Sequence, residues 1–222
     1  MYFSGLEDKY PVKYQKQGSY VGGLFVFESK LTQEFRLHFD EKIAEMFQSI
    51  GIREGSVWIE VFHDGENYYF NEVGFRYGGS VSIYPVDYFY QINQVAADIH
   101  YALTGESCIS EHTSLIRSTL PRKKYYCIYP VHINAGTISS ISGLDKIAQL
   151  ENIVYLATTK YLHDRIESSG SFSQVFALVH FVCNTTEECI QTIDRIHQML
   201  VVFDEHGNNM VNRMLDVGKI IF

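Results

Sequence analysis

The stretch Trp58–Gly79 reads WIEVFHDGENYYFNEVGFRYGG and has the pattern of one β-hairpin. Two runs rich in aromatic and β-branched residues flank a turn that carries Asp, Gly and Asn. Glu60 and Glu72 stand within these apolar runs, where an acidic side chain is costly unless something compensates its charge. A divalent cation would compensate it, so this hairpin is the strongest clue to function in the chain.

The register of the hairpin decides whether Glu60 and Glu72 share a face. A two-residue turn at the Asp-Gly pair would put them on opposite faces. A longer loop centred on Glu66 places them directly opposite each other, with Cβ atoms roughly 4.5–5.5 Å apart. We favour the longer loop because it also pairs Phe62 with Phe70, and cross-strand aromatic pairs are stabilising.

Two opposed carboxylates repel, and a protein relieves this by protonating one, by adding a cationic side chain or by binding a metal. Hard oxygen ligands suit Mg²⁺ or Mn²⁺, usually with phosphate oxygens completing the shell. Arg76 follows Glu72 on the same side of an extended chain, where it would neutralise a carboxylate or clamp a phosphoryl group. Gly78, Gly79 and Ser80 then provide backbone that can approach an anion closely. The simpler alternative is a solvent-facing polar hairpin with an Arg–Glu ion pair.

Composition narrows the class of protein. The chain has 222 residues, of which 46% are hydrophobic and 20% charged, as expected of a folded chain with a sizeable core. Its net charge of −8 argues against non-specific binding to nucleic acid or to an anionic membrane. No basic-then-apolar signal segment or membrane-length apolar run is evident, so we predict a cytoplasmic protein that binds neither nucleic acid nor membrane.

The four cysteines show no spacing typical of a zinc site and no C-x-x-C motif. We therefore predict that all four are structural or incidental, with Cys127 and Cys183 as buried free thiols in apolar runs. The nine histidines are scattered and never take i, i+4 metal spacing, and His180 is expected to be a core histidine.

The order of predicted elements indicates an α+β fold with a mainly antiparallel sheet. Helices are predicted over 40–50 and 87–104, the second with a buried stripe that includes Ile99 and Leu103. A third helix begins at Thr185, where Glu188 completes a capping box. Strands are predicted over 19–29, 125–133, 154–158 and 175–183. The polar stretch 106–124 is expected to connect a first domain, 1–105, to a second, 125–222.

The hairpin resembles the C-terminal half of the ATP-grasp fold, and in particular the large subunit of carbamoyl-phosphate synthase. The family signature is a strand ending in a carboxylate, a turn, and a strand reading Glu-x-Asn-x-Arg. Here the second strand reads Glu-Val-Gly-Phe-Arg. The resemblance implies that Glu60 and Glu72 hold Mg²⁺ or Mn²⁺ against the ATP phosphates. It implies that Arg76 stabilises the transferred phosphoryl group and that Lys30 contacts a phosphate or substrate carboxylate.

The match departs from the family at Gly74, which stands where an asparagine is usually a further metal ligand. This puts a second metal in doubt, and Asn71 is expected to point to the other face by strand parity. The resemblance makes 1–105 a partial catalytic subdomain and 125–222 a lid or substrate subdomain with its own α+β structure. The adenine-binding first half of the fold is expected to lie elsewhere in the same chain or in another chain.

The expected function is therefore the catalytic part of an ATP-dependent carboxylate–amine or carboxylate–thiol ligase, in which ATP converts a small carboxylate to an acyl phosphate. The isolated chain is expected to be inactive. The alternative is a non-catalytic, ATP-grasp-derived module for interaction or dimerisation, because the 16 Tyr and 15 Phe allow aromatic-rich interfaces.

Overall fold

A computed structural model of the chain describes residues 3–79, 81–109 and 124–222, and it separates into two compact units. The first, called here the hairpin unit, comprises Met1–Gly5 and Leu31–Pro121. The second, the sheet unit, comprises Leu6–Lys30 and Arg122–Phe222. The predicted α+β class with mainly antiparallel sheet is confirmed. The division of the chain differs from the predicted boundary at 105, because residues 6–30 pair with strands of the C-terminal half. Most of the predicted connector, 106–124, lies outside the described residues.

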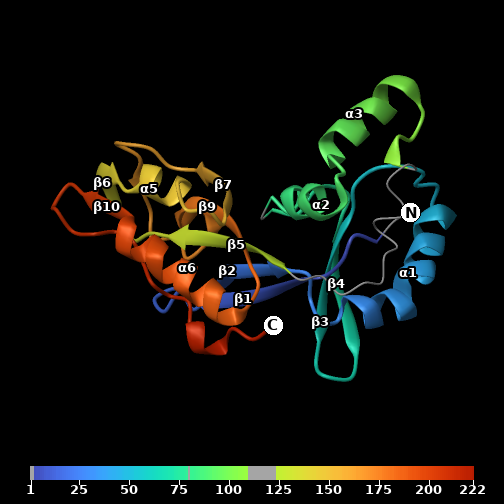
Figure 1. Cartoon of the computed structure of the whole chain (residues 1–222), viewed down its shortest axis with the longest axis horizontal. Coiled ribbons are helices and arrows are strands. Elements are labelled where there is room, and N and C mark those ends of the chain that lie inside the picture. Colours follow the sequence, from blue (N-terminus) through green and yellow to red (C-terminus); the bar gives the residue numbers. More distant parts are fainter. Residues whose placement is uncertain (1–2, 80, 110–123) are drawn as a thin grey trace. The chain divides into compact units, whose positions relative to one another are not determined.

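The sheet unit is built on a five-stranded sheet in the order β1-β2-β5-β9-β7, in which every neighbouring pair is antiparallel (Figure 1). A smaller antiparallel sheet has the order β10-β6-β8. The strands are β1 (Glu7–Lys13), β2 (Tyr20–Phe27), β5 (Tyr125–His132), β6 (Gly136–Ser142), β7 (Ile153–Thr158), β8 (Arg165–Ile166), β9 (Val175–Cys183) and β10 (Val201–Asp204). The helices are α5 (Leu144–Ala148) and α6 (Thr186–Met199), with the short 3₁₀ turns η2 (Phe172–Gln174) and η3 (Val217–Lys219).

The core of the sheet unit lies between the large sheet and α6. Strands β5 and β9 are continuous apolar runs and are buried almost throughout, as expected of central strands covered on both faces. Helix α6 lies across the sheet in Figure 1 and buries Ile193 and Ile196. Its predicted start is confirmed: the Thr185 side chain accepts from Glu188 N at 3.2 Å, and the Glu188 carboxylate accepts from Asn184 N at 2.7 Å.

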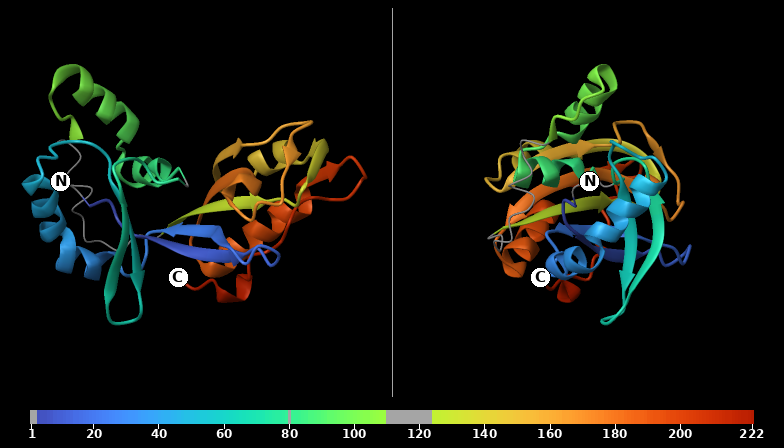
Figure 2. Two further views of the ribbon diagram at one scale, coloured as in Figure 1. Left: turned by 180° about the vertical axis from the view of Figure 1, so that it is seen from behind. Right: turned by 90° about the vertical axis from the view of Figure 1, so that its right-hand side faces the viewer.

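The hairpin unit consists of α1 (Thr32–Ser49), β3 (Trp58–His63), β4 (Tyr68–Gly74), α2 (Ile83–Tyr90) and α3 (Gln94–Thr104). Strands β3 and β4 form a two-stranded sheet, and Figure 2 shows α1 running beside this ribbon. An isolated hairpin is marginally stable in water, so its support comes from packing. That support is aromatic: Phe35 and Phe39 of α1 lie 5.3–6.1 Å, between ring centroids, from Tyr68 and Phe70 of β4.

Two helix predictions were wrong in detail. The helix predicted over 40–50 begins eight residues earlier, at Thr32. The helix predicted over 87–104 is two helices, because Gln91 takes a left-handed conformation with φ 57° and the Asn93 side chain then caps α3 by accepting from Ala96 N. This break re-aims the second helix, so the predicted buried residues Ile99 and Leu103 are 55% and 81% exposed. Among the described residues, no helix has the length and apolar character needed to span a bilayer.

Candidate functional site

The β3–β4 turn is a four-residue loop, 64–67, organised by one aspartate. The last cross-strand pair before it joins His63 to Tyr68. The Asp64 carboxylate accepts from the backbone N–H groups of Glu66 and Asn67 at 2.9 and 2.8 Å. It also accepts from the Tyr69 hydroxyl at 2.9 Å. These hydrogen bonds lower the pKa of Asp64 to about 2, because they stabilise the charged form.

A β-bulge brings the two predicted metal ligands together. Near the loop the pairing runs Phe62 with Tyr69, so the predicted Phe62–Phe70 pair was wrong. The register then shifts between Glu60 and Val61, and one extra residue, Asn71, is accommodated in β4. Beyond the bulge Glu60 pairs directly with Glu72, as predicted. Directly paired residues project to the same face of an antiparallel ladder, so the two carboxylates share a face.

The bulge also overturns the expectation for Asn71. Strand parity predicted that its side chain points away from the glutamates, but parity fails at an inserted residue. The Asn71 amide donates to Glu60 Oε2 at 2.7 Å. Asn71 therefore orients one of the two carboxylates, and this role was missed because a bulge leaves no clear signal in the sequence.

Gly74, the departure from the expected asparagine, is explained by its cross-strand partner. Trp58 pairs with Gly74, and a Cβ added to this glycine would lie 2.1 Å from Trp58 Nε1. The indole thus occupies the space that a larger side chain at position 74 would need. The same ring also contacts Arg76, whose guanidinium carbon lies 5.0 Å from the ring centroid. Arg76 Nη1 also donates to the Tyr77 carbonyl at 2.8 Å.

The loop after β4 is fixed by residues that the sequence did not single out. The Tyr77 hydroxyl donates to Asp98 Oδ2 of α3 at 2.5 Å, and the Ser56 hydroxyl donates to the same oxygen at 3.3 Å. Burial, with Asp98 adding to it, raises the pKa of Tyr77 to about 12. Gly78 follows in a turn in which its carbonyl accepts from Val81 N at 3.2 Å.

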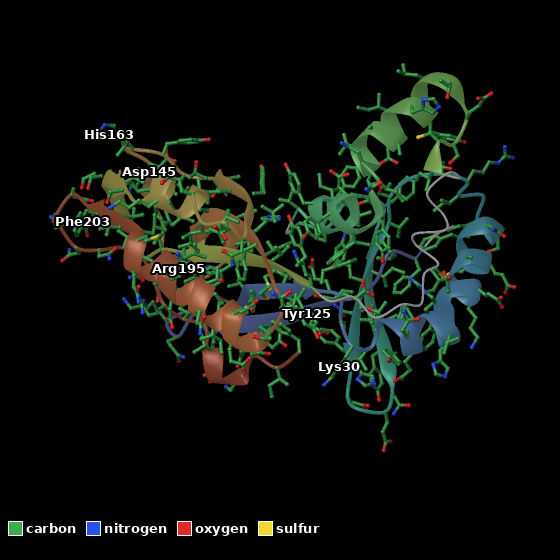
Figure 3. All side chains as sticks on the ribbon, viewed as in Figure 1. Lys30, Tyr125, Asp145, His163, Arg195 and Phe203 are labelled. Atoms are coloured by element: carbon green, nitrogen blue, oxygen red, sulfur yellow. The ribbon has the colours of Figure 1, made fainter. Side chains whose placement is uncertain are left out.

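Of the predicted anion-binding residues, Gly79 is exposed, and a Cβ added to it would meet nothing within 4 Å. Ser80 lies outside the described residues. Lys30 belongs to the sheet unit and follows β2, where Figure 3 labels it. Its local surroundings contain Asp8 and Ser29: burial raises the pKa of Asp8, while a hydrogen bond with Ser29 and the charge of Lys30 oppose that rise.

The Glu60 and Glu72 carboxylates suit a hard cation, and they supply only part of its coordination shell. Glu60 and Glu72 offer carboxylate oxygens from one face, which is the chemistry that Mg²⁺ and Mn²⁺ prefer. Within the described parts of the chain, no carboxylate or histidine joins them to form a group of three metal ligands. The remaining positions on an ion would be taken by water or by oxygens of a ligand, as in sites where Mg²⁺ is shared with phosphates.

Comparison with solved structures gives several matches to the fold of this chain. An L-amino acid ligase from Bacillus licheniformis matches with a TM-score of 0.67 and 20% identity, over 92% of this chain and 53% of that chain. Phosphoribosylglycinamide synthetase from Anaerococcus prevotii matches with a TM-score of 0.68 and 14% identity, over 91% and 50%. Neither a scan of protein-family models nor a search of curated proteins gives a match.

A third match is the biotin carboxylase domain of the 2-oxoglutarate carboxylase of Hydrogenobacter thermophilus, in complex with MgADP, ADP and bicarbonate. Its TM-score is 0.63 at 14% identity, over 88% of this chain and 45% of that chain. At such identities the likeness establishes the fold. The chain spans about half the length of the solved structures that it matches.

Proposed function

Because the chain has the fold of about half of an ATP-grasp enzyme, we propose that it is the catalytic C-terminal half of an ATP-dependent carboxylate–amine or carboxylate–thiol ligase. The observation that carries the proposal is the direct pairing of Glu60 with Glu72 across β3 and β4. In this role the two carboxylates hold Mg²⁺ or Mn²⁺, and the ion supplies Lewis-acid activation and charge neutralisation at the ATP phosphates.

The residues of the hairpin have separate tasks in this proposal. Asn71 keeps the Glu60 carboxylate turned toward the shared face. Arg76, placed on the indole of Trp58, stabilises negative charge on the phosphoryl group as it moves to the substrate carboxylate. Since the indole fills the space beside Gly74, no third protein ligand comes from that position, and we propose one metal site at the hairpin.

Other parts of the proposal concern the surroundings of the hairpin. Backbone at Gly78, Gly79 and Ser80 approaches the nucleotide phosphates, and Lys30 contacts a phosphate or a substrate carboxylate. The adenine-binding half comes from elsewhere in the same polypeptide or from a partner chain, which agrees with the coverage of about half in the matched structures. The free cysteines agree with a cytoplasmic location, which we retain as part of the proposal.

The experiment uses the natural polypeptide that contains this chain, with any partner that copurifies with it. ADP release is measured with candidate carboxylates, and hydroxylamine traps an acyl phosphate as a hydroxamate. Glu72→Gln and Arg76→Ala should each reduce carboxylate-dependent ADP release by at least about 100-fold, the scale of a lost transition-state contact. Glu66→Gln makes the same chemical change in the exposed loop of the same hairpin and should leave the rate unchanged. Unchanged turnover in both site variants would remove the assignment.

A second candidate function is a non-catalytic interaction or dimerisation module. The observation that favours it is that three large apolar side chains of the hairpin unit, Leu37, Leu103 and Phe75, are 86%, 81% and 62% exposed. Titration with Mn²⁺ in the presence of ATP, followed by the loss of the free Mn²⁺ signal in electron paramagnetic resonance, separates the two functions. A module has no Mn²⁺ site that Glu72→Gln abolishes, and its mass in solution would correspond to a homodimer.

A further inference from the structure

Three of the four cysteines converge in the core of the sheet unit, although they are far apart in sequence. Cys127 comes from β5, Cys183 from the end of β9, and Cys189 from the first turns of α6. Cys127 Sγ lies 3.6 Å from Cys183 Sγ and 3.9 Å from Cys189 Sγ, and all three sulfurs lie within 4.8 Å of one another. All three side chains are buried.

Sheet register and helix packing together produce this cluster. Cys127 pairs with Phe181 on β9, so Cys183 lies two residues further along the neighbouring strand, at a diagonal position. The capping box at Thr185 starts α6 directly after β9, and Cys189 falls one turn later, on the helix face that packs on the sheet. The trio is therefore fixed by backbone geometry on three elements.

The sulfur spacing suits a single metal ion. A metal–sulfur bond of about 2.3 Å requires sulfurs about 3.8 Å apart in a tetrahedral site and about 4.0 Å apart in a planar three-coordinate site. Two observed separations, 3.6 and 3.9 Å, need little adjustment to reach these values, and the third, between Cys183 and Cys189, is at most 4.8 Å. A disulfide instead requires a sulfur–sulfur distance of about 2.05 Å, so bonding any pair would need a larger movement.

A cavity borders the cluster within the same unit. A cavity of about 630 Å³ is lined by Cys183 together with polar side chains that include Glu188, Asn152 and Thr192. Cys183 is therefore the member of the cluster that borders this cavity. Buried metal sites need an entry path, and a set of thiols enclosed on every side would lack one.

We propose that Cys127, Cys183 and Cys189 form a three-thiolate binding site for one thiolate-binding d¹⁰ metal ion, Zn²⁺ or Cu⁺. Thiolate ligands select these ions over Mg²⁺ and Ca²⁺. Each thiol that binds the ion releases its proton to solvent, and no electron transfer is involved. The site is separate from the hairpin carboxylates, which prefer hard cations, so the proposal goes beyond ATP chemistry.

The test uses the whole 222-residue chain, reduced and freed of metal with a chelator. One sample is titrated with Cd²⁺, a spectroscopic substitute for Zn²⁺ whose thiolate charge-transfer absorption reports the number of bound sulfurs. A second sample is titrated with Cu⁺ in competition with bicinchoninate. We expect one equivalent bound per chain by at least one of these ions, with an absorption corresponding to three thiolates, and a rise in Tm on binding.

Variants assign the sulfurs. Cys127→Ala, Cys183→Ala and Cys189→Ala should each weaken binding by more than about 100-fold, the upper range for loss of an outer-shell partner. Cys108→Ala is the matched control, because Cys108 is exposed and lies in the hairpin unit, and it should bind as the parent chain does. Circular dichroism shows whether each variant is folded. If a variant unfolds, the number of metal ions bound per parent chain still tests the proposal. Absence of binding by both ions to the reduced parent chain, or equal binding by folded cluster variants, would overturn the proposal.

Discussion

Replacing Gly74 by alanine tests whether Trp58 occupies the space of the missing asparagine. The added Cβ would lie 2.1 Å from Trp58 Nε1, and 2.8 and 2.9 Å from Cδ1 and Cε2 of the same ring. Carbon–nitrogen contacts settle near about 3.5 Å, so the indole must move by more than about 1 Å. The ring is rigid, and it cannot yield by rotating one flexible end.

Three contributions change the free energy of unfolding of the hairpin unit in Gly74→Ala, two of them destabilising and one stabilising. Overpacking of this kind typically costs about 1–3 kcal/mol. Displacement of the ring also removes the contact with Arg76, worth about 0.5–1 kcal/mol at an exposed site. Alanine restricts the unfolded chain and returns about 0.4–1 kcal/mol. We therefore expect Gly74→Ala to destabilise the hairpin unit by about 1–3 kcal/mol.

Trp58 is the single tryptophan of the chain, so its emission reports the hairpin unit alone. Urea unfolding followed at this emission should show a lower midpoint for Gly74→Ala and a red-shifted native spectrum as the indole becomes more exposed. Gly79→Ala is the control, because its Cβ meets nothing within 4 Å. If the two variants have the same midpoint and unshifted spectra, the indole does not cover Gly74 and our explanation of the departure is wrong.

Three further predictions address the register, the loop and the core. Deleting Asn71 should remove the bulge but make Phe70 and Glu72 neighbours, so Glu60 should still pair with Glu72; the deletion and Asn71→Ala should therefore both keep Mn²⁺ binding, each weakened about 10-fold by loss of the amide that orients Glu60, and abolished binding in the deletion alone would contradict the register argument. Asp64→Asn should lower the stability of the hairpin unit above pH 4, and in the parent chain this contribution should fade as the pH falls toward 2; the emission of Trp58 in urea measures both effects. Burial lowers the pKa of His180 to about 4, so the unfolded state takes up a proton first, and up to about 3 kcal/mol of stability is lost as the pH falls from 6.5 to 4. Circular dichroism of urea unfolding should show that His180→Gln loses this part of the pH dependence and that the exposed His206→Gln keeps it; identical curves would refute the assignment.

The sequence predicted correctly those features that depend on residues close together in one helix or strand. The N-cap at Thr185 depends only on neighbouring residues, and it was confirmed, although the Glu188 carboxylate accepts from the N–H of Asn184, one residue before the cap. Strand β9 was predicted over 175–183, and it has these bounds, because a continuous apolar run between turn signals has few alternatives. His180 is fully buried in this strand, as predicted, with Nδ1 3.1 Å from the Tyr126 hydroxyl.

Features that depend on two segments far apart in the sequence were either missed or predicted correctly for the wrong reason. The pairing of Glu60 with Glu72 was predicted from a loop centred on Glu66, but it arises from a shorter loop plus a bulge at Asn71. The sequence does not reveal which residue a strand will leave unpaired. The cysteine cluster was missed because its spacing matches no zinc motif, and its members meet only through the β5–β9 register and the packing of α6. The one available signal was that Cys127 and Cys183 stand in apolar runs.

The pairing of β2 with β5 sets an order of events during synthesis. Phe27 pairs with Tyr126, so nearly one hundred residues must be translated before β2 meets its neighbour. At about 5–20 residues per second this takes about 5–20 s, during which β1 and β2 form only a marginal hairpin. The intervening segment 31–121 forms one compact unit together with Met1–Gly5, which is already translated, so this unit has time to fold first. The apolar strand β2 therefore stays unpaired on one edge until β5 has been translated. Binding of the nascent chain by chaperones should be greatest in this interval.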